Sequence, residues 1–385
     1  MTIPEAGGAI EESQAQARLL GHLVGAGYAG VTPPVLQPVE PFLELSGEEI
    51  RRRIFVTQDA AGTEFCLRPE FTIPVCRHHL ARASSTSADY SYLGPVFRLA
   101  RGEPDEFLQA GIESIGRTDI PAADAEVVGL ALDGLALLGR TDVEVRLGDM
   151  GLIDSFLDAL EVPPAAKRRT VRALAGGRSL DEVANPATVE DPHAGLLAAI
   201  QGQDPRGVRA FVEDVLSIAG ISRVGGRSAG EIAERFLAKA AAQANGGTGL
   251  NAENRALIER YRAISADPDR AASEIRALVR DARLDHPPLD EAISLLEERT
   301  GFMAARGLDV ERVRFSAGFA RNLDYYTGFI VEVRASGSDA ILVGGGRYDG
   351  LLQHLGSAVP VPAVGCAFWL SRITASGQPT QARGA

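Results

Sequence analysis

The stretch ADYSYLGPVFRLARGEPDEFLQAGIESIG, residues 88–116, indicates the architecture of the chain more clearly than any other part of it. Apolar and polar residues alternate over 88–100 and again over 105–116, as they do in half-buried β-strands. The Gly/Pro segment 102–104 joins them, so the two segments predict an antiparallel hairpin with an irregular tip. Alternate residues of the second strand form one partly polar face: Phe107, Gln109, Gly111, Glu113 and Ile115.

The segments on either side of this hairpin add short strands and helices. Further strands are predicted around a turn at 61–62 and at 143–147, 313–315, 329–334, 340–343 and 363–367. Helices are predicted at 11–26, 72–83, 122–138, 348–355 and 368–373. This mixture predicts an α+β fold, a mixed and largely antiparallel sheet flanked by helices.

Helix signals dominate from about residue 151 to residue 307, where strand signals nearly vanish. Asp267 followed by Pro268 predicts a helix start, since Asp caps helices well and Pro suits the first turn. We therefore predict a discontinuous core (1–150 and 308–373), an all-helical insertion (151–307) and a flexible tail (374–385). The Gly/Ala-rich segment within the insertion, residues 238–254, could instead be a flexible linker.

Composition narrows the class of protein. The 385 residues are 45% hydrophobic, which predicts a globular chain, and the net charge of −12 disfavours an extended nucleic-acid surface. Three cysteines give neither a disulfide framework nor metal-ligand spacing, and His78 and His79 are adjacent on a helix, so no metal site is expected. No signal peptide or run of about twenty apolar residues occurs. We expect a cytoplasmic protein that binds neither membrane nor nucleic acid.

Four places put polar side chains among apolar neighbours. They are Glu70 with Thr72; Arg98 on the first hairpin strand, opposite Gln109 and Glu113; Arg321 with Asp324, Tyr325 and Tyr326; and Arg372. Together they suit a small zwitterion, because carboxylates and hydroxyls receive an ammonium group while arginine clamps a carboxylate. Three of the four have a simpler alternative: Glu70 as a surface charge, Gln109 and Glu113 on a solvated sheet face, and the tyrosines as one core ring and one exposed ring.

Read in order, five segments resemble the catalytic core of class II aminoacyl-tRNA synthetases, specifically the histidyl enzyme and its paralogues. LRPEFT (67–72) is similar to the LRPEGT segment of that family, and residues 94–116 are similar to the motif 2 hairpin. FARNLDYYTGFIVEV (319–333) resembles the histidine-specific RGLDYY segment, and VGGGRYDGLL (343–352) resembles AGGRYDGL. PAVGCAFWLSRI (362–373) resembles motif 3. The similarity spans nearly the whole chain and implies a class II synthetase-like sheet.

The resemblance also implies a nearly complete binding site for L-histidine. The matching positions are Glu70, Thr72, Arg98, Gln109, Glu113, Arg321, Tyr325 and Tyr326. Glu70 and Thr72 match residues that take the amino group, and Arg98 matches the motif 2 arginine. No catalytic residue, metal or cofactor is expected.

The departures from the synthetase pattern concern the nucleotide and tRNA. Ala100 stands where motif 2 has an ATP-contacting glutamate, and Phe71 and Trp369 replace glycines. The motif 2 loop is short and acidic, and we expect no anticodon-binding domain after motif 3. An indole at Trp369 would occupy much of the space that a nucleotide needs.

This pattern resembles the synthetase paralogues that serve as regulatory subunits of ATP phosphoribosyltransferase. It implies a non-catalytic subunit that senses histidine for the first step of histidine biosynthesis, with a short-form catalytic subunit as its partner. It also implies a homodimer core within a heteromultimer, with the two-fold interface built by about Val31–Leu45. Two alternatives remain: a truncated synthetase-like enzyme that activates an amino acid with ATP, and a scaffold with a vestigial pocket.

Overall fold

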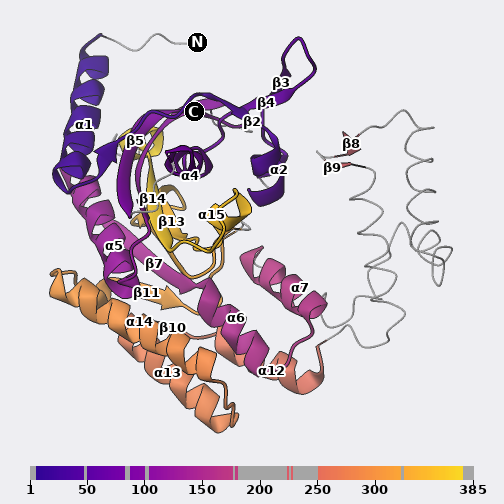
Figure 1. The fold of residues 1–385 in the computed structure, drawn as a ribbon. Coiled ribbons are helices and arrows are strands. Elements are labelled where there is room, and N and C mark those ends of the chain that lie inside the picture. Colours follow the sequence, from indigo (N-terminus) through magenta and orange to yellow (C-terminus); the bar gives the residue numbers. More distant parts are fainter. Residues whose placement is uncertain are drawn as a thin grey trace, which may run out of the picture.

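A nine-stranded sheet forms the centre of the molecule (Figure 1). The computed structural model describes residues 6–46, 50–82, 87–99, 104–176, 178–180, 223–224, 227–228, 250–321 and 325–375. The strand order is β1-β5-β6-β14-β13-β12-β7-β11-β10. The strands span Ala29–Gly30 (β1), Ala88–Phe97 (β5), Glu106–Ile115 (β6), Val143–Asp149 (β7), Ser265–Ala266 (β10), Val313–Ser316 (β11), Phe329–Ala335 (β12), Ile341–Arg347 (β13) and Ala363–Trp369 (β14). All pairs from β5 to β7 are antiparallel, which confirms the predicted α+β fold.

The hairpin of β5 and β6 is present, but its register differs from the prediction for Arg98. Tyr90 faces Glu113 and Gly94 faces Gln109 across the ladder. Arg98 lies beyond the end of β5, where its backbone N–H donates to the Asp105 carbonyl at 2.8 Å. The expectation that Arg98 stands opposite Gln109 and Glu113 is therefore wrong, because the strands run on to a pairing of Phe97 with Glu106 near the tip.

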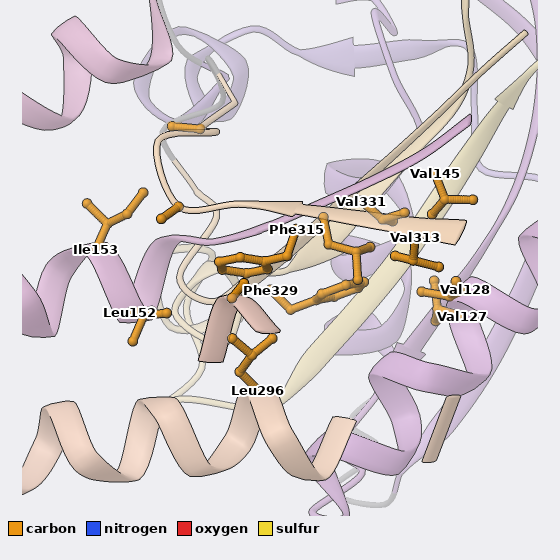
Figure 2. Packing of buried hydrophobic residues seen from close by; sticks show 14 of the residues in the cluster. Val127, Val128, Val145, Leu152, Ile153, Leu296, Val313, Phe315, Phe329 and Val331 are labelled. Atoms are coloured by element: carbon orange, nitrogen blue, oxygen red, sulfur yellow. The ribbon is translucent and has the colours of Figure 1, made fainter. Parts of the chain in front are cut away.

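Helices cover one face of the sheet and bury the larger hydrophobic cluster. They include α1 (Ala6–Gly25), α5 (Ile120–Leu137), α6 (Met150–Ala159), α13 (Pro268–Asp281) and α14 (Pro287–Ala305). Figure 2 shows Leu296 of α14 below Phe315 and Phe329 of the sheet, with Val127 and Val128 of α5 beside the same strands. Helix α5 is apolar on nearly every side, as its position between the sheet and α14 requires.

The other face of the sheet carries a smaller layer. It consists of a three-stranded sheet, β2 (Leu36–Pro38), β4 (Glu64–Leu67) and β3 (Val56–Gln58), with helices α2 (Glu40–Leu45), α4 (Thr72–Ala81) and α15 (Leu351–His354). Tyr92, Ile115 and Phe71 belong to its buried cluster. The side chains of β6 thus alternate between two cores, with Ala110 and Ile112 pointing toward the helical side.

The predicted helical block is described only in part. Its described elements are α6, α7 (Pro164–Ala175), β8 (Arg223–Val224), β9 (Arg227–Ser228), α12 (Ala252–Arg262), β10, α13 and α14. Asp267 caps α13 as predicted, since its carboxylate accepts the Arg270 N–H at 3.0 Å. Helices α13 and α14 share the buried cluster of the sheet, and β10 pairs with β11. The division at 151 and 307 stays a prediction, because most of 181–249 lies outside the described residues.

The chain end and the short elements complete the description. Strand β14 continues through Trp369 into α16 (Leu370–Ala375), and η1 (Val310–Arg312) precedes β11. Residues 376–385, most of the predicted tail, lie outside the described part. Within the described residues, no helix has the length and apolar character needed to cross a membrane.

Candidate ligand-binding site

A cavity of about 180 Å³ lies between the glycine-rich strands of the sheet and the layer of α4. Seven of the eight predicted ligand residues line it: Glu70, Thr72, Arg98, Gln109, Arg321, Tyr325 and Tyr326. An apolar cavity of about 150 Å³ already holds benzene, so this one has room for a small amino acid-sized ligand. Its size and its mixed polar lining suit such a ligand.

Glu70 lies between β4 and the start of α4 and is only 5% exposed. Its carboxylate accepts the backbone N–H groups of Thr72 at 2.5 Å and Ile73 at 3.0 Å, so it also holds the first turn of α4. Burial raises the pKa of Glu70, while these N–H donors and the charge of Arg98 act in the opposite direction. A carboxylate offers about four acceptor positions, so Glu70 retains capacity for an ammonium group. The alternative of a surface charge is excluded.

Glu113 lies directly behind the cavity rather than on its wall. Its carboxylate accepts the hydroxyl groups of Tyr348, of Thr72 at 2.8 Å and of Tyr92 at 3.4 Å. Burial raises the pKa of Glu113 to about 8, against the lowering effect of the Tyr348 and Thr72 hydroxyls. Gly365 of β14 makes the space for it, since a Cβ atom there would collide with the carboxylate. Glu113 thus orients two side chains that do face the cavity, and its role toward a ligand stays a prediction.

Three tyrosine rings close one side of the cavity. The ring centroids of Tyr325 and Tyr326 are 5.0 Å apart, and Tyr348 meets Tyr325 edge-on at 5.9 Å. Tyr325 is buried and Tyr326 is half-buried. Tyr348 lines the cavity as well, although it is not among the eight residues that the resemblance assigned to the ligand. Its position in VGGGRYDGLL, one of the segments that carry the resemblance, could have indicated it.

Two polar groups face the cavity with unused hydrogen-bonding capacity. Gln109 is 2% exposed, and its Oε1 atom accepts no hydrogen bond from the described residues. Arg321 donates from Nη1 to the Val331 carbonyl at 3.3 Å and forms no ion pair with a described carboxylate. Arg98 donates from Nε to the Pro69 carbonyl at 2.7 Å, which fixes its guanidinium at the rim. A buried acceptor beside guanidinium groups suits a ligand that carries both signs of charge.

Trp369 occupies the end of the cavity where the resemblance places a nucleotide. It is 7% exposed, and the guanidinium carbons of Arg372 and Arg321 lie 5.4 and 6.0 Å from its ring. Phe71, the other glycine replacement, stacks on Tyr92 at 4.3 Å and stays in the core. Ala100 and Asp324 lie outside the described residues.

A chain of buried ion pairs supports the cavity from behind. Asp124 of α5 accepts hydrogen bonds from Arg299 at 2.9 Å and from Arg347 at 2.6 and 2.9 Å. Arg299 continues to Asp149 at 3.0 Å, and Arg347 continues to Asp349 at 2.9 Å. Arg347 directly precedes Tyr348, so this series of ion pairs connects the cavity wall to α5 and α14. Local sequence gave no signal for these pairs, whose partners are mostly far apart along the chain.

Comparison with known proteins places these observations in a family. A family model described as histidyl-tRNA synthetase matches residues 7–217 and 207–373. The ATP phosphoribosyltransferase regulatory subunit of Agrobacterium fabrum is 41% identical over 353 residues, which cover 90% of this chain and 92% of that protein. The chain belongs to the family of ATP phosphoribosyltransferase regulatory subunits. The regulatory subunit of Rhizobium rhizogenes, 38% identical over 89% of this chain and 92% of its own length, agrees.

Solved structures extend the assignment to the fold. A Bacillus halodurans protein described as an ATP phosphoribosyltransferase regulatory subunit/histidyl-tRNA synthetase has a TM-score of 0.72, with 18% identity, 98% coverage of this chain and 82% of that chain. Histidyl-tRNA synthetase from Nostoc sp. PCC 7120 has a TM-score of 0.65 with 16% identity, over 96% of this chain and 72% of that one. The predicted class II synthetase-like fold of this regulatory-subunit family is confirmed.

Proposed function

We propose that the chain is a non-catalytic regulatory subunit of ATP phosphoribosyltransferase that binds free L-histidine in the cavity around Glu70. The observation that carries the proposal is a pair of buried carboxylates, Glu70 and Glu113, that form no ion pair with any described residue. A cationic ligand would lower their raised pKa values and supply the missing charge. The family name supports the regulatory role.

The lining suggests how each part of histidine is held. Glu70 receives the ammonium group, and Arg321 clamps the carboxylate or borders the ring. Gln109 offers its free Oε1 to a donor of the ligand, and Tyr325 and Tyr326 enclose the imidazole.

Regulation requires that histidine bind two states of the assembly with different affinity. We propose that a short-form catalytic subunit is the partner and that a homodimer is the core of the complex. The proposed two-fold segment, Val31–Leu45, carries two exposed apolar side chains, Val35 at 37% and Leu36 at 47%. Light scattering on the isolated chain should give a dimer at micromolar concentration; a monomer alone would contradict this part.

The assembled complex tests the proposal. Addition of the chain to its short-form catalytic subunit should raise phosphoribosyltransferase activity, and L-histidine should then inhibit it. Glu70→Gln and Arg321→Ala should relieve the inhibition and keep the activation. Unaltered inhibition in both variants would place the effector site on the catalytic subunit.

A second function, amino-acid activation with ATP, is favoured by one observation: Arg98 and Arg372 both line the cavity at the positions of the motif 2 and motif 3 arginines. Trp369 argues against it, since the indole lines the same cavity, with its ring centroid 6.0 Å from the guanidinium carbon of Arg321 and 5.4 Å from that of Arg372. Pyrophosphate exchange with histidine and ATP should stay at the no-protein level. Turnover above that level would establish the enzyme and contradict the non-catalytic role.

A further inference from the structure

A second groove lies beside the proposed histidine cavity, between α6, α7 and the segment Tyr326–Thr327. Its volume is about 670 Å³, within the range of about 300–1,000 Å³ that is usual for small-molecule sites. Its charged lining consists of Lys167, Arg168, Arg172, Arg321 and Asp154. Four cations therefore face one carboxylate, in a chain whose net charge is −12.

The cations of α7 differ in how they are neutralised. Lys167 pairs with Asp154 and Asp158, each at 2.7 Å. Arg168 and Arg172 are exposed and form no ion pair within the described ranges of the chain. They are four residues apart on one helix, so they lie on the same face and repel each other. This arrangement destabilises α7 unless an anion approaches that face.

Arg321 joins the groove to the histidine cavity. It lines both, together with Tyr326, and it also lines a third cavity of about 380 Å³ between the end of α7 and β12. Its guanidinium group has five N–H donors, and the one hydrogen bond found for it in the described structure is the 3.3 Å contact with Val331. Arg321 therefore has donors to spare for an anion in the groove.

We propose that this groove binds a compact polyanion, a small molecule that carries a diphosphate or phosphate ester, through Arg168, Arg172 and Arg321. Guanidinium groups bind phosphate oxygens bidentately, and three of them around a groove of about 670 Å³ suit a small ligand with several charges better than an extended acidic peptide. Because Arg321 and Tyr326 border both sites, occupation of the groove and of the histidine cavity is coupled. The coupling rests on the proposed histidine site, whereas the proposed binding of a polyanion in the groove does not.

Calorimetric titration of inorganic pyrophosphate into the full chain at low salt tests the groove. Loss of two charge-assisted contacts in Arg168→Ala/Arg172→Ala should weaken binding by about tenfold to a hundredfold or more. The control variant Arg260→Ala/Arg280→Ala removes the same charge from exposed positions of α12 and α13 and should retain affinity within about twofold. Absent binding to the wild type, equal loss in both variants, or unaltered affinity in the groove variant would overturn the proposal. Weaker assembly with the catalytic subunit, without pyrophosphate binding, would identify a protein interface instead and also overturn it.

Repetition with saturating L-histidine tests the coupling. The pyrophosphate affinity should change by about fivefold or more, histidine affinity should change by the same factor, and Arg321→Ala should abolish the change. If both ligands bind the wild type with unchanged affinities, the coupling is wrong. If histidine does not bind at all, the proposed function fails while the pyrophosphate titration still decides the groove.

Discussion

Two groups of buried carboxylates lie around the cavity, and they are satisfied in opposite ways. Asp124 and Asp149 meet the guanidinium groups of Arg299 and Arg347, and all four side chains are at most 6% exposed. Glu70 and Glu113 are buried to the same degree, but only N–H and hydroxyl groups donate to them. The first group is complete within the protein, whereas the second lacks a cation.

We call Asp124 and Asp149, with Arg299 and Arg347, the framework group, because the protein itself supplies both charges. Glu70 and Glu113 are the binding-site group. A buried charge is costly unless it is paired, and each of the two aspartates has an arginine as its partner. The glutamates tolerate burial because hydrogen bonds support them and because burial raises their pKa values toward the neutral form. A ligand with an ammonium group would complete the second group as arginine completes the first.

The largest effect is expected where the framework group is broken. Arg347→Ala leaves Asp124 without one partner and frees Asp349, so it should lower the free energy of unfolding by about 3–5 kcal/mol. Urea denaturation measures it. Arg276→Ala removes a surface pair, with Glu297 at 2.7 Å and both side chains about 40% exposed, and should cost less than about 1 kcal/mol. Similar losses of unfolding free energy in the two variants would mean that the buried ion pairs stabilise the fold no more than a surface ion pair does.

A smaller effect is expected where the sheet leaves space for Glu113. In Gly365→Ala the new methyl group would collide with the Glu113 carboxylate and the Ile112 carbonyl, so the side chain or strand must shift at a cost of about 1–3 kcal/mol. Gly301→Ala is the matched control: no heavy atom lies within 4 Å of its Cβ, so better helix propensity should stabilise α14 by up to about 1 kcal/mol. Thermal or urea unfolding of both variants should show a lower stability for Gly365→Ala and a higher one for Gly301→Ala. An unchanged stability of Gly365→Ala would contradict the close contact between Gly365 and Glu113.

The binding-site group should also respond to pH. The pKa of Glu113 is raised from 4.5 to about 8, so between these values the folded protein holds a proton that the unfolded chain releases. The free energy of unfolding should therefore fall as pH rises from about 5 to 8, by at most about 1.4 kcal/mol per pH unit from this group. Denaturation across this range should show a flatter slope in Glu113→Gln. An unchanged slope would mean that Glu113 is ionised throughout.

The sequence predicted the elements that depend on local patterns. Alternation over 88–100 and 105–116 gave the hairpin, and Asp267–Pro268 gave the start of α13. Motif order gave seven residues that line one cavity, although they are up to 256 positions apart, because each motif carries its own recognisable residues.

The remainder depends on contacts that no local pattern records. Arg347 meets Asp124 across 223 residues and Arg299 meets Asp124 across 175, and neither arginine differs in its local sequence from a surface arginine. The displacement of Arg98 from Gln109 follows from the exact point where the hairpin pairing ends, which the irregular tip obscured. Tyr348 was not predicted as a cavity residue, because its place on the wall depends on how the end of β13 packs against Tyr325 and Glu113.

Titration calorimetry with L-histidine tests the central claim, that the site around Glu70 binds a ligand that carries an ammonium group. The wild type should bind one histidine per chain. Glu70→Gln keeps an acceptor for the first turn of α4 but removes the charge. This variant and Arg321→Ala should each weaken histidine binding by about tenfold to a thousandfold, because a desolvated charged contact typically contributes about 2–5 kcal/mol. Trp369→Gly, on the nucleotide side, should change the affinity far less. No binding to the wild type, or unchanged affinity in both Glu70→Gln and Arg321→Ala, would contradict the account.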